Sequence, residues 1–447
     1  MLPLTIFEKY MFLDDRAEYP MDSFRRLLFS GPFNTDVFVQ SLAAVVRWNP
    51  MFRSIVKQKG QQLYWQEIDT PLFVKRSTGN SCPVPERIQL RNEPGFKVYI
   101  AQDDAVSGDP PHDRQTQVLL QFHHSVSDGI GEMEFIGDVL TDYAVRITGQ
   151  TPAENPRQLD PELLKIRGQS GLTMKSYFRY FFDTIFTTRQ ILLGMPSPLA
   201  PCRRVPEVLT DYYAFCSHEI SSEETAAYFA AAKAKGVTVN DLLLCGLFTA
   251  MGSWRQRWAD SLPEKNRNPN FRAAVPMNLR TGRHKQIPAS NTVTMLFLDR
   301  RYRQCLEDKE KVLRGVRREM EWIKRTEQKH YLLTTMQMRD RLPGGLAMSL
   351  RYPQCRSTVV LSNLGQVLGG LPLPRREDGK LRIGESVLEE IDANPPIRYG
   401  TLFSFSVLTY AGRLRFVLRY DSQNVTAEQA NDFLYRNVRQ FAGRDFS

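Results

Sequence analysis

The alternation of strand-like and helix-like segments, which begins a second time past the middle of the chain, most constrains the fold of this protein. In the first part, strand patterns precede and follow a helical one, and a buried strand over 117–122 leads into a helix from Ile130. In the second part, a helix over 222–235 and a second, largely buried helix precede several strand-like segments. This order predicts two layered α/β domains rather than one doubly wound sheet.

Single residues predict where some of these elements begin and end. Asn34 or Thr35 is placed to begin the first long helix, and Asn240 or Asp241 to begin the buried helix of the second part. The segment STVVLSNLG (357–365) is a β-branched run followed by turn-forming residues. It therefore predicts a strand that ends in a loop.

A proline-rich region between residues 150 and 205 separates the two parts and contains the aromatic segment SYFRYFFDTIF. A length of 447 residues is enough for two or three domains. We therefore expect a first domain at 1–185, a linker at 186–205 and a second domain at 206–447. The aromatic segment predicts a packed linker helix, with an amphipathic helix in peripheral contact with a membrane as the alternative.

The charge of the chain favours anionic partners in general. It has 59 Lys and Arg residues against 49 Asp and Glu residues, a formal net charge of +10. The densest basic stretch, Arg300 to Lys329, has apolar residues at helical spacing, which predicts the solvated face of an amphipathic helix, with phosphate contact as the alternative. No recognition helix, zinc finger or aromatic platform accompanies the charge, so we expect no nucleic-acid binding.

The sequence carries no signal for secretion, membrane insertion or a zinc site. The opening MLPLTIFEKYMFLDDR has no basic leader or small-residue cleavage site, and no apolar run approaches the ~18–20 residues of a membrane-spanning helix. The six cysteines form no CxxC pair, which argues against a zinc site and a disulfide scaffold. We expect a cytoplasmic monomer with no metal and no bound cofactor.

The motif HHSVSDG (123–129) is the candidate catalytic site of the sequence. It lies between a buried strand and the start of a helix, where a side chain is held rigidly and yet faces a cleft. An imidazole is the natural general base for a hydroxyl or an amine near neutral pH. Asp128 could orient a histidine or pair with an arginine to hold the loop, and Gly129 permits a tight turn. A hydrogen-bonded structural pair is the alternative for the two histidines.

No other catalytic motif competes with this one. The sequence has no GxSxG elbow, Walker A loop, GxGxxG or HExxH. A nucleophilic serine or cysteine is therefore not supported. The motif favours a base that acts directly on the acceptor, without a covalent enzyme intermediate.

These residues resemble a known family. HHSVSDG matches the HHxxxDG motif of the chloramphenicol-acetyltransferase-like acyltransferases, a superfamily that includes nonribosomal condensation domains, wax ester synthases and alcohol acetyltransferases. The resemblance covers most of the chain and is nearest to the alcohol acetyltransferase and wax ester synthase-like branch. Further segments resemble motifs of the superfamily in the expected order: FEKYMFLDDRAEYP, RWNPMFRS, TVNDLLL, VPMNLR, SNTVTMLFL and LSNLG.

The resemblance implies two similar chloramphenicol-acetyltransferase-like domains with mixed sheets and an active-site tunnel between them. By the match of the motif, His124 is the catalytic base and His123 is a supporting residue. Asp128 is expected to have a structural role by pairing with an arginine. Arg280 is the expected partner and Arg53 the alternative.

The implied reaction is acyl transfer from a thioester, expected to be acyl-CoA, to a small alcohol. His124 would take the proton of the acceptor and return it to the leaving thiolate. Asn291, Asn363 and backbone amides near Gly129 are candidates to stabilise the oxyanion or contact the substrate. For either asparagine, a strand-end turn residue is the alternative.

Two other functions fit the same residues. An N-acyltransferase or condensation enzyme would use an amine acceptor and a thioester held by an acyl carrier protein. A catalytically silent module would keep the tunnel and recruit acyl carriers. The presence of both His124 and Asp128 favours an enzyme over the silent module.

Overall fold

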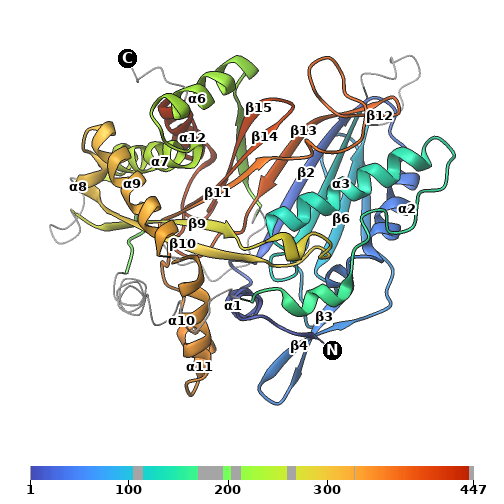
Figure 1. Cartoon of the computed structure of the whole chain (residues 1–447), viewed down its shortest axis with the longest axis horizontal. Helices are drawn as coiled ribbons and strands as arrows, with labels where there is room; N and C mark the ends of the chain where they lie inside the picture. The colour runs from blue at the N-terminus through green and yellow to red at the C-terminus, as the bar shows by residue number, and fades with distance from the viewer. Residues whose placement is uncertain are drawn as a thin grey trace.

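Two six-stranded sheets form the framework of the protein, and most helices pack against them (Figure 1). The computed structural model describes residues 2–103, 114–169, 195–202, 213–258, 268–326 and 328–441. Both sheets contain parallel and antiparallel neighbours. The predicted layered α/β architecture with mixed sheets is therefore confirmed.

The first sheet has the strand order β12-β13-β2-β7-β6-β5, with all neighbours antiparallel except β5 and β6. Its strand β7 contains the predicted buried segment 117–122, and helices α2 and α3 pack on one face of the sheet. Strands β12 and β13 come from the second part of the chain, which thus completes the first sheet. The strands are β2 (Asp22–Ser30), β5 (Val74–Thr78), β6 (Phe96–Gln102), β7 (Gln115–His123), β12 (Arg382–Ile383) and β13 (Ser386–Asn394).

The second sheet has the order β10-β9-β11-β14-β15-β8. Its β14–β15 hairpin turns at Ala411 and Gly412, which have φ of +49° and +76°. A two-residue hairpin turn that matches the twist of the flanking strands requires positive φ at both residues. A small third sheet, β1-β4-β3, lies beside the first. The strands are β8 (Phe215–Glu219), β9 (Asn270–Asn278), β10 (Val293–Arg301), β11 (Val359–Gln366), β14 (Phe403–Tyr410), β15 (Arg413–Tyr420), β1 (Leu2–Pro3), β3 (Ser54–Lys59) and β4 (Gln62–Glu67).

Short polar side chains start the long helices. Asn34 caps α2, as one of the two predicted residues. The cap of α7 is Thr238 rather than Asn240 or Asp241, because Thr238 and Asp241 bond each other's backbone amides in a capping box. The helices are α1 (Ile6–Asp14), α2 (Thr35–Val46), α3 (Gly129–Arg146), α6 (Ser222–Ala234), α7 (Val239–Arg255), α8 (Tyr302–Cys305), α9 (Lys309–Arg325), α10 (Tyr331–Asp340), α11 (Gly345–Leu350) and α12 (Ala427–Phe441).

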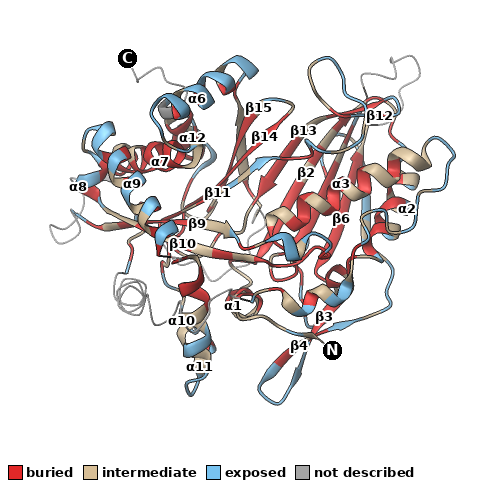
Figure 2. Cartoon of the chain, viewed as in Figure 1, coloured by how far each residue is buried: buried red, intermediate tan, exposed pale blue. Residues whose placement is uncertain are grey.

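Each sheet has its own hydrophobic core, visible as the buried residues of Figure 2. Helices α6, α7, α9 and α12 cover the second sheet, with Trp254 and Phe403 packed edge to face at 5.2 Å between ring centroids. Between the sheets, α1 packs against α10 and β10 in a smaller apolar cluster that includes Phe7 and Leu333. This cluster adjoins the functional site described below.

An ionic network centred on the buried Asp392 joins the two sheets. Arg415 on β15 bonds Asp392 at 2.5 Å and Glu390 at 2.7 Å, and both carboxylates lie on β13 of the first sheet. Arg26 on β2 bonds the same two carboxylates at 2.7 and 2.6 Å. Asp392 is fully buried. The network therefore fixes the position of one sheet relative to the other.

Strand β11 differs from the prediction for LSNLG. It continues to Gln366, with a shift of register between Asn363 and Gly365 and a φ of +65° at Gly365. The expectation of a loop here was wrong, because the glycine is used in a β-bulge. The aromatic segment 176–186 and most of the predicted linker lie outside the described residues, so the domain division stays a prediction.

Candidate active site

The loop between β7 and α3 is held from both ends. His123 is the last residue of β7, and its amide donates to the Gly95 carbonyl at 2.9 Å. Asp128 caps α3 by accepting from the Gly131 amide at 2.9 Å. The amide of His124 donates to the Met21 carbonyl at 2.7 Å. These contacts leave the loop little backbone freedom.

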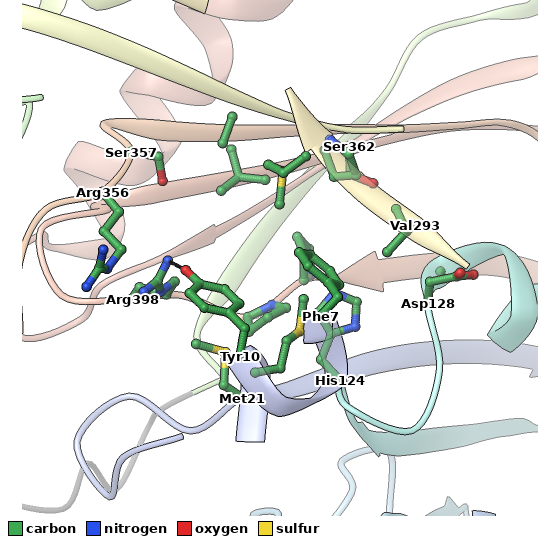
Figure 3. Close-up of a pocket in the computed structure, with 18 of the residues that line it drawn as sticks. Phe7, Tyr10, Met21, His124, Asp128, Val293, Arg356, Ser357, Ser362 and Arg398 are labelled. Carbon is green, nitrogen blue, oxygen red and sulfur yellow. Dashed lines mark hydrogen bonds between the residues drawn. The ribbon is translucent and has the colours of Figure 1, made fainter. Parts of the chain in front are cut away.

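The ring of His124 is fixed in one tautomer by its own loop. Its Nδ1 lies 3.1 Å from the Ser127 carbonyl oxygen, which can only accept a hydrogen bond. Nδ1 therefore carries the proton, and Nε2 keeps a free lone pair. No described residue hydrogen-bonds Nε2, and His124 lines a cavity (Figure 3). The arrangement presents an unprotonated nitrogen to whatever occupies that cavity.

The surroundings of His124 keep its ring neutral. Burial, together with the nearby guanidinium of Arg25, lowers the pKa of His124 from 6.5 to about 4. Arg25 is itself buried and paired with Glu132 at 2.5 Å. At neutral pH the imidazole is thus available to accept a proton.

His123 points away from the cavity. Its Nδ1 accepts from the Ser125 amide at 3.2 Å, and its Nε2 lies 3.8 Å from Asp15 Oδ1. Burial and then the Arg87 guanidinium lower the pKa of His123 to about 3. A neutral, almost fully buried ring with these contacts supports the loop.

Asp128 pairs with an arginine rather than with His124. Its Oδ2 accepts from Arg280 Nη1 at 2.8 Å and from the Thr292 amide at 2.7 Å. Burial raises the pKa of Asp128, but Arg280 and these amides outweigh burial and hold it below its usual value. The alternative partner, Arg53, instead pairs with Glu67 at 2.8 Å. Asp128 therefore connects the first part of the chain to the loop that follows β9.

The two asparagines lie in different places. Asn291 is buried, and its Nδ2 donates to the main-chain carbonyl of His124 at 2.7 Å. Asn363 is exposed and accepts from the Gly365 amide at 3.0 Å. Because side chains alternate along β11, Ser362 lines the cavity and Asn363 faces away from it. The structure thus brings Asn291, but not Asn363, to the histidine loop.

The cavity lies between the two sheets and contains about 980 Å³ of space, including its opening to solvent. Its walls come from α1, the His124 loop, β9, β10, α10 and β11. Most of the lining is apolar, with residues such as Phe7, Met11, Met295, Phe297 and Leu332. Gly129 lines the cavity at the first residue of α3, where the backbone amide has no acceptor within the helix. Ligand sites commonly have this mixture of an apolar wall and a few polar groups.

Several cavity residues could not be recognised from the sequence. Arg25 lies on β2 beside a second arginine, Arg26, and nothing in the sequence distinguishes the one that lines the cavity. Tyr10, Arg356 and Arg398 come from three distant parts of the chain and meet only in the fold (Figure 3). No motif joins them in sequence.

Among the described residues, no group of three or more His, Cys, Asp or Glu side chains could hold a metal ion. Within the same part of the chain, no single helix is long and apolar enough to cross a membrane, and α6 with α7 meets that test only as a pair bent by 100°.

Comparison with known proteins places the fold. No family model matches the chain. The uncharacterized protein Rv2305 of Mycobacterium tuberculosis is 25% identical over 274 residues, which is 57% of this chain and 57% of that protein. The chain thus matches little more than half the length of this curated relative.

Solved structures cover the chain almost completely. The trichothecene 15-O-acetyltransferase from Fusarium sporotrichioides has a TM-score of 0.67 at 11% identity, covering 99% of this chain and 94% of its own. The first condensation domain of the calcium-dependent antibiotic synthetase has a TM-score of 0.65 at 16% identity, covering 99% and 95%. The starter condensation domain of rhizomide synthetase, in complex with C8-CoA and Leu-SNAC, has a TM-score of 0.64 at 15% identity, covering 99% and 93%.

The protein therefore has the fold of condensation domains and chloramphenicol-acetyltransferase-like acyltransferases. At the level of the fold this confirms the resemblance inferred from the HHSVSDG motif. Its place in the alcohol acetyltransferase and wax ester synthase-like branch stays a prediction.

Proposed function

We propose that this protein transfers an acyl group from a thioester to a hydroxyl group, with His124 as the general base. The observation that carries the proposal is the single tautomer of His124, whose Nε2 is free at the wall of an apolar cavity. The fold shared with an O-acetyltransferase and with condensation domains supports the same class of reaction.

The reaction needs no covalent enzyme intermediate. Nε2 of His124 accepts the hydroxyl proton while the oxygen forms a bond to the thioester carbonyl carbon. The carbon–sulfur bond of the tetrahedral intermediate then breaks, and the thiolate takes the proton from Nε2. The products are an ester and a free thiol.

The negative charge of the intermediate needs hydrogen-bond donors nearby. The backbone amides at Gly129, in the first turn of α3, are the proposed donors, and the helix dipole favours an anion there. Asn291 acts through the main chain of His124 and is a positioning residue. A nearby oxyanion also stabilises the imidazolium, whose charge the buried cavity otherwise disfavours.

The proposed donor is acyl-CoA and the proposed acceptor a small alcohol. A second candidate is amide formation from a carrier-bound thioester, which the condensation-domain neighbours favour. The two differ in what they need. An alcohol acyltransferase releases coenzyme A when the chain, acyl-CoA and an alcohol are mixed, whereas the condensation enzyme requires an acyl carrier protein and an amine.

The test measures thiol release from a panel of acyl-CoAs with alcohol and amine acceptors. We expect His124→Ala to lose a factor of about 10²–10⁴ in rate, the usual contribution of a positioned base. The control is His218→Ala, since His218 lies on β8 outside the cavity lining. Equal rates for His124→Ala and the wild type would remove His124 from the mechanism.

A further inference from the structure

The charged side chains that line the cavity are unequally compensated. Of the four, Arg25 is paired with Glu132 at 2.5 Å, Asp128 is paired with Arg280 at 2.8 Å, and Arg398 is paired with Asp14. Arg356 has no carboxylate within ion-pair distance among the residues the structure describes. Its Nη2 donates only to the neutral Ser349 carbonyl, at 2.5 Å. Arg356 therefore leaves a positive charge at the cavity wall.

Arg356 and Arg398 lie together at one side of the cavity, and His124 lies at the other (Figure 3). Arg398 is anchored on α1, where its guanidinium donates to the Tyr10 hydroxyl and lies 5.0 Å over the Tyr10 ring. Its Nε is buried and has no hydrogen-bond partner. This end of the cavity thus combines an unpaired charge with an unused buried donor.

Arg356 is partly exposed, and the apolar wall beside it reduces the number of water molecules that can solvate its guanidinium. A carboxylate or a phosphate supplies both the charge and the acceptor oxygens that its planar N–H groups match. The Nε and Nη1 groups of Arg356 make no hydrogen bond in the described structure, and Nη1 could donate to one such group together with the second N–H of Nη2.

We propose that the Arg356–Arg398 end of the cavity binds a carboxylate or phosphate carried by a substrate whose reacting group lies at His124. The idea deepens the proposed function, on which it rests for the role of His124. It assigns a substrate class: an acyl-transfer partner that is anionic at one end and apolar between that end and the reacting group.

Binding can be tested without turnover. The probes are hexanoate, its neutral match 1-hexanol, and adenosine 3′,5′-bisphosphate as the phosphate portion of coenzyme A, each titrated against the full chain by thermal shift. We expect one anionic probe to bind the wild type at least about 10-fold more tightly than Arg356→Met, a change of the size a charge-assisted pair supplies. Hexanol should bind both proteins equally.

Arg351→Met is the matched control, because it removes the same charge from an exposed position five residues earlier. Loss with hexanoate would identify a carboxylate substrate, and loss with the bisphosphate would identify the phosphates of the donor. If neither anion distinguishes Arg356→Met from the wild type, or if Arg351→Met weakens binding as much, the proposal is overturned.

A second arm separates this proposal from the proposed reaction. Rates with 6-hydroxyhexanoate and 1-hexanol as acceptors give a ratio of kcat/KM, and a carboxylate acceptor predicts a fall of about 10-fold in that ratio in Arg356→Met. Anion binding that depends on Arg356, without transfer from any thioester, would preserve the anion site and reject the acyltransferase. Acyl transfer that is lost in His124→Ala, together with no dependence of anion binding on Arg356, would preserve the acyltransferase and reject the anion site.

Discussion

At the scale of single residues, the hydrogen bond from His124 Nδ1 to Ser127 determines which nitrogen can act as a base. The same ring is half-buried beside a guanidinium, which opposes its protonation. Its neighbour His123 uses both ring nitrogens inside the protein. The two adjacent histidines therefore have different contacts, although they are the same residue type.

The pH dependence of activity follows from the lowered pKa of His124. Only the neutral ring accepts a proton, so we expect kcat/KM to stay level from pH 8 down to about 5 and to fall towards a midpoint at about 4. Circular dichroism over the same range is the control, because buried neutral histidines destabilise the fold as pH falls below 6.5. A midpoint near 6.5 with the protein still folded would contradict the pKa argument.

Asp128→Asn tests the structural role of the carboxylate. The variant leaves Arg280 without its counter-charge, so we expect a loss of about 3 kcal/mol in the free energy of unfolding, measured with urea. Asp36→Asn is the control, because its pair with Arg76 is exposed and is expected to contribute less than about 1 kcal/mol. Unchanged stability with loss of turnover would favour a His–Asp dyad instead.

At the scale of elements, the start of α3 is packed too closely for any side chain larger than glycine. A Cβ at Gly131 would lie 2.6 Å from Ser127 Oγ, 3.1 Å from Arg280 Nη2 and 3.2 Å from the Ser290 amide nitrogen. This contact brings the loop of one part of the chain against the loop that follows β9. The N-terminus of α3 thus packs directly against the second part of the chain.

Gly131→Ala and Gly315→Ala should have opposite effects on stability. We expect Gly131→Ala to cost about 1–3 kcal/mol by overpacking. Gly315 lies inside α9 with its nearest neighbour at 3.5 Å, so alanine there should add about 0.5–1 kcal/mol through helix propensity. Chemical denaturation of both variants measures the change in the free energy of unfolding. A stabilised Gly131→Ala would contradict the packing described.

Local pattern predicted the elements well where capping and periodicity agreed. The helix after Asn34 and the strand before HHSVSDG are both present. Prediction failed at Thr238, because Asn240 and Asp241 two and three residues later are equally good capping residue types, and at Gly365, where a turn residue forms a bulge. At Thr238 the reciprocal bonds with Asp241 select the cap, and at Gly365 the pairing of β11 with β14 continues past the glycine.

At the scale of the whole molecule, β13 connects the two sheets. Its backbone is hydrogen-bonded into the first sheet, and its carboxylates also form ion pairs with an arginine of the second sheet. Asp392 is shared by Arg26 and Arg415, which reach it from different sheets. The cavity lies between these sheets. Its shape therefore depends on contacts far from the histidine.

Asp392→Asn should weaken the whole fold. The buried Arg415 and the partly buried Arg26 would lose a counter-charge, so we expect a loss of about 3–5 kcal/mol in the free energy of unfolding, read from the urea midpoint. Glu219→Gln is the control, because Glu219 is partly exposed and lies 3.4 and 3.6 Å from its arginines. Similar midpoints for the two variants would show that the network does not stabilise the junction of the sheets.

The amino-acid sequence by itself determined what is local: the strand, the HHSVSDG loop and the helix that follows it, because caps and periodicity act over a few residues. Only the tertiary structure decided that Arg280 rather than Arg53 reaches Asp128, that Asn363 faces outwards, and that residues 382–394 complete the first sheet. It also gathered Tyr10, Arg356 and Arg398 at one end of the cavity. Such contacts join residues from dozens to hundreds of positions apart, and their geometry follows from the packing of whole sheets, which no short pattern encodes.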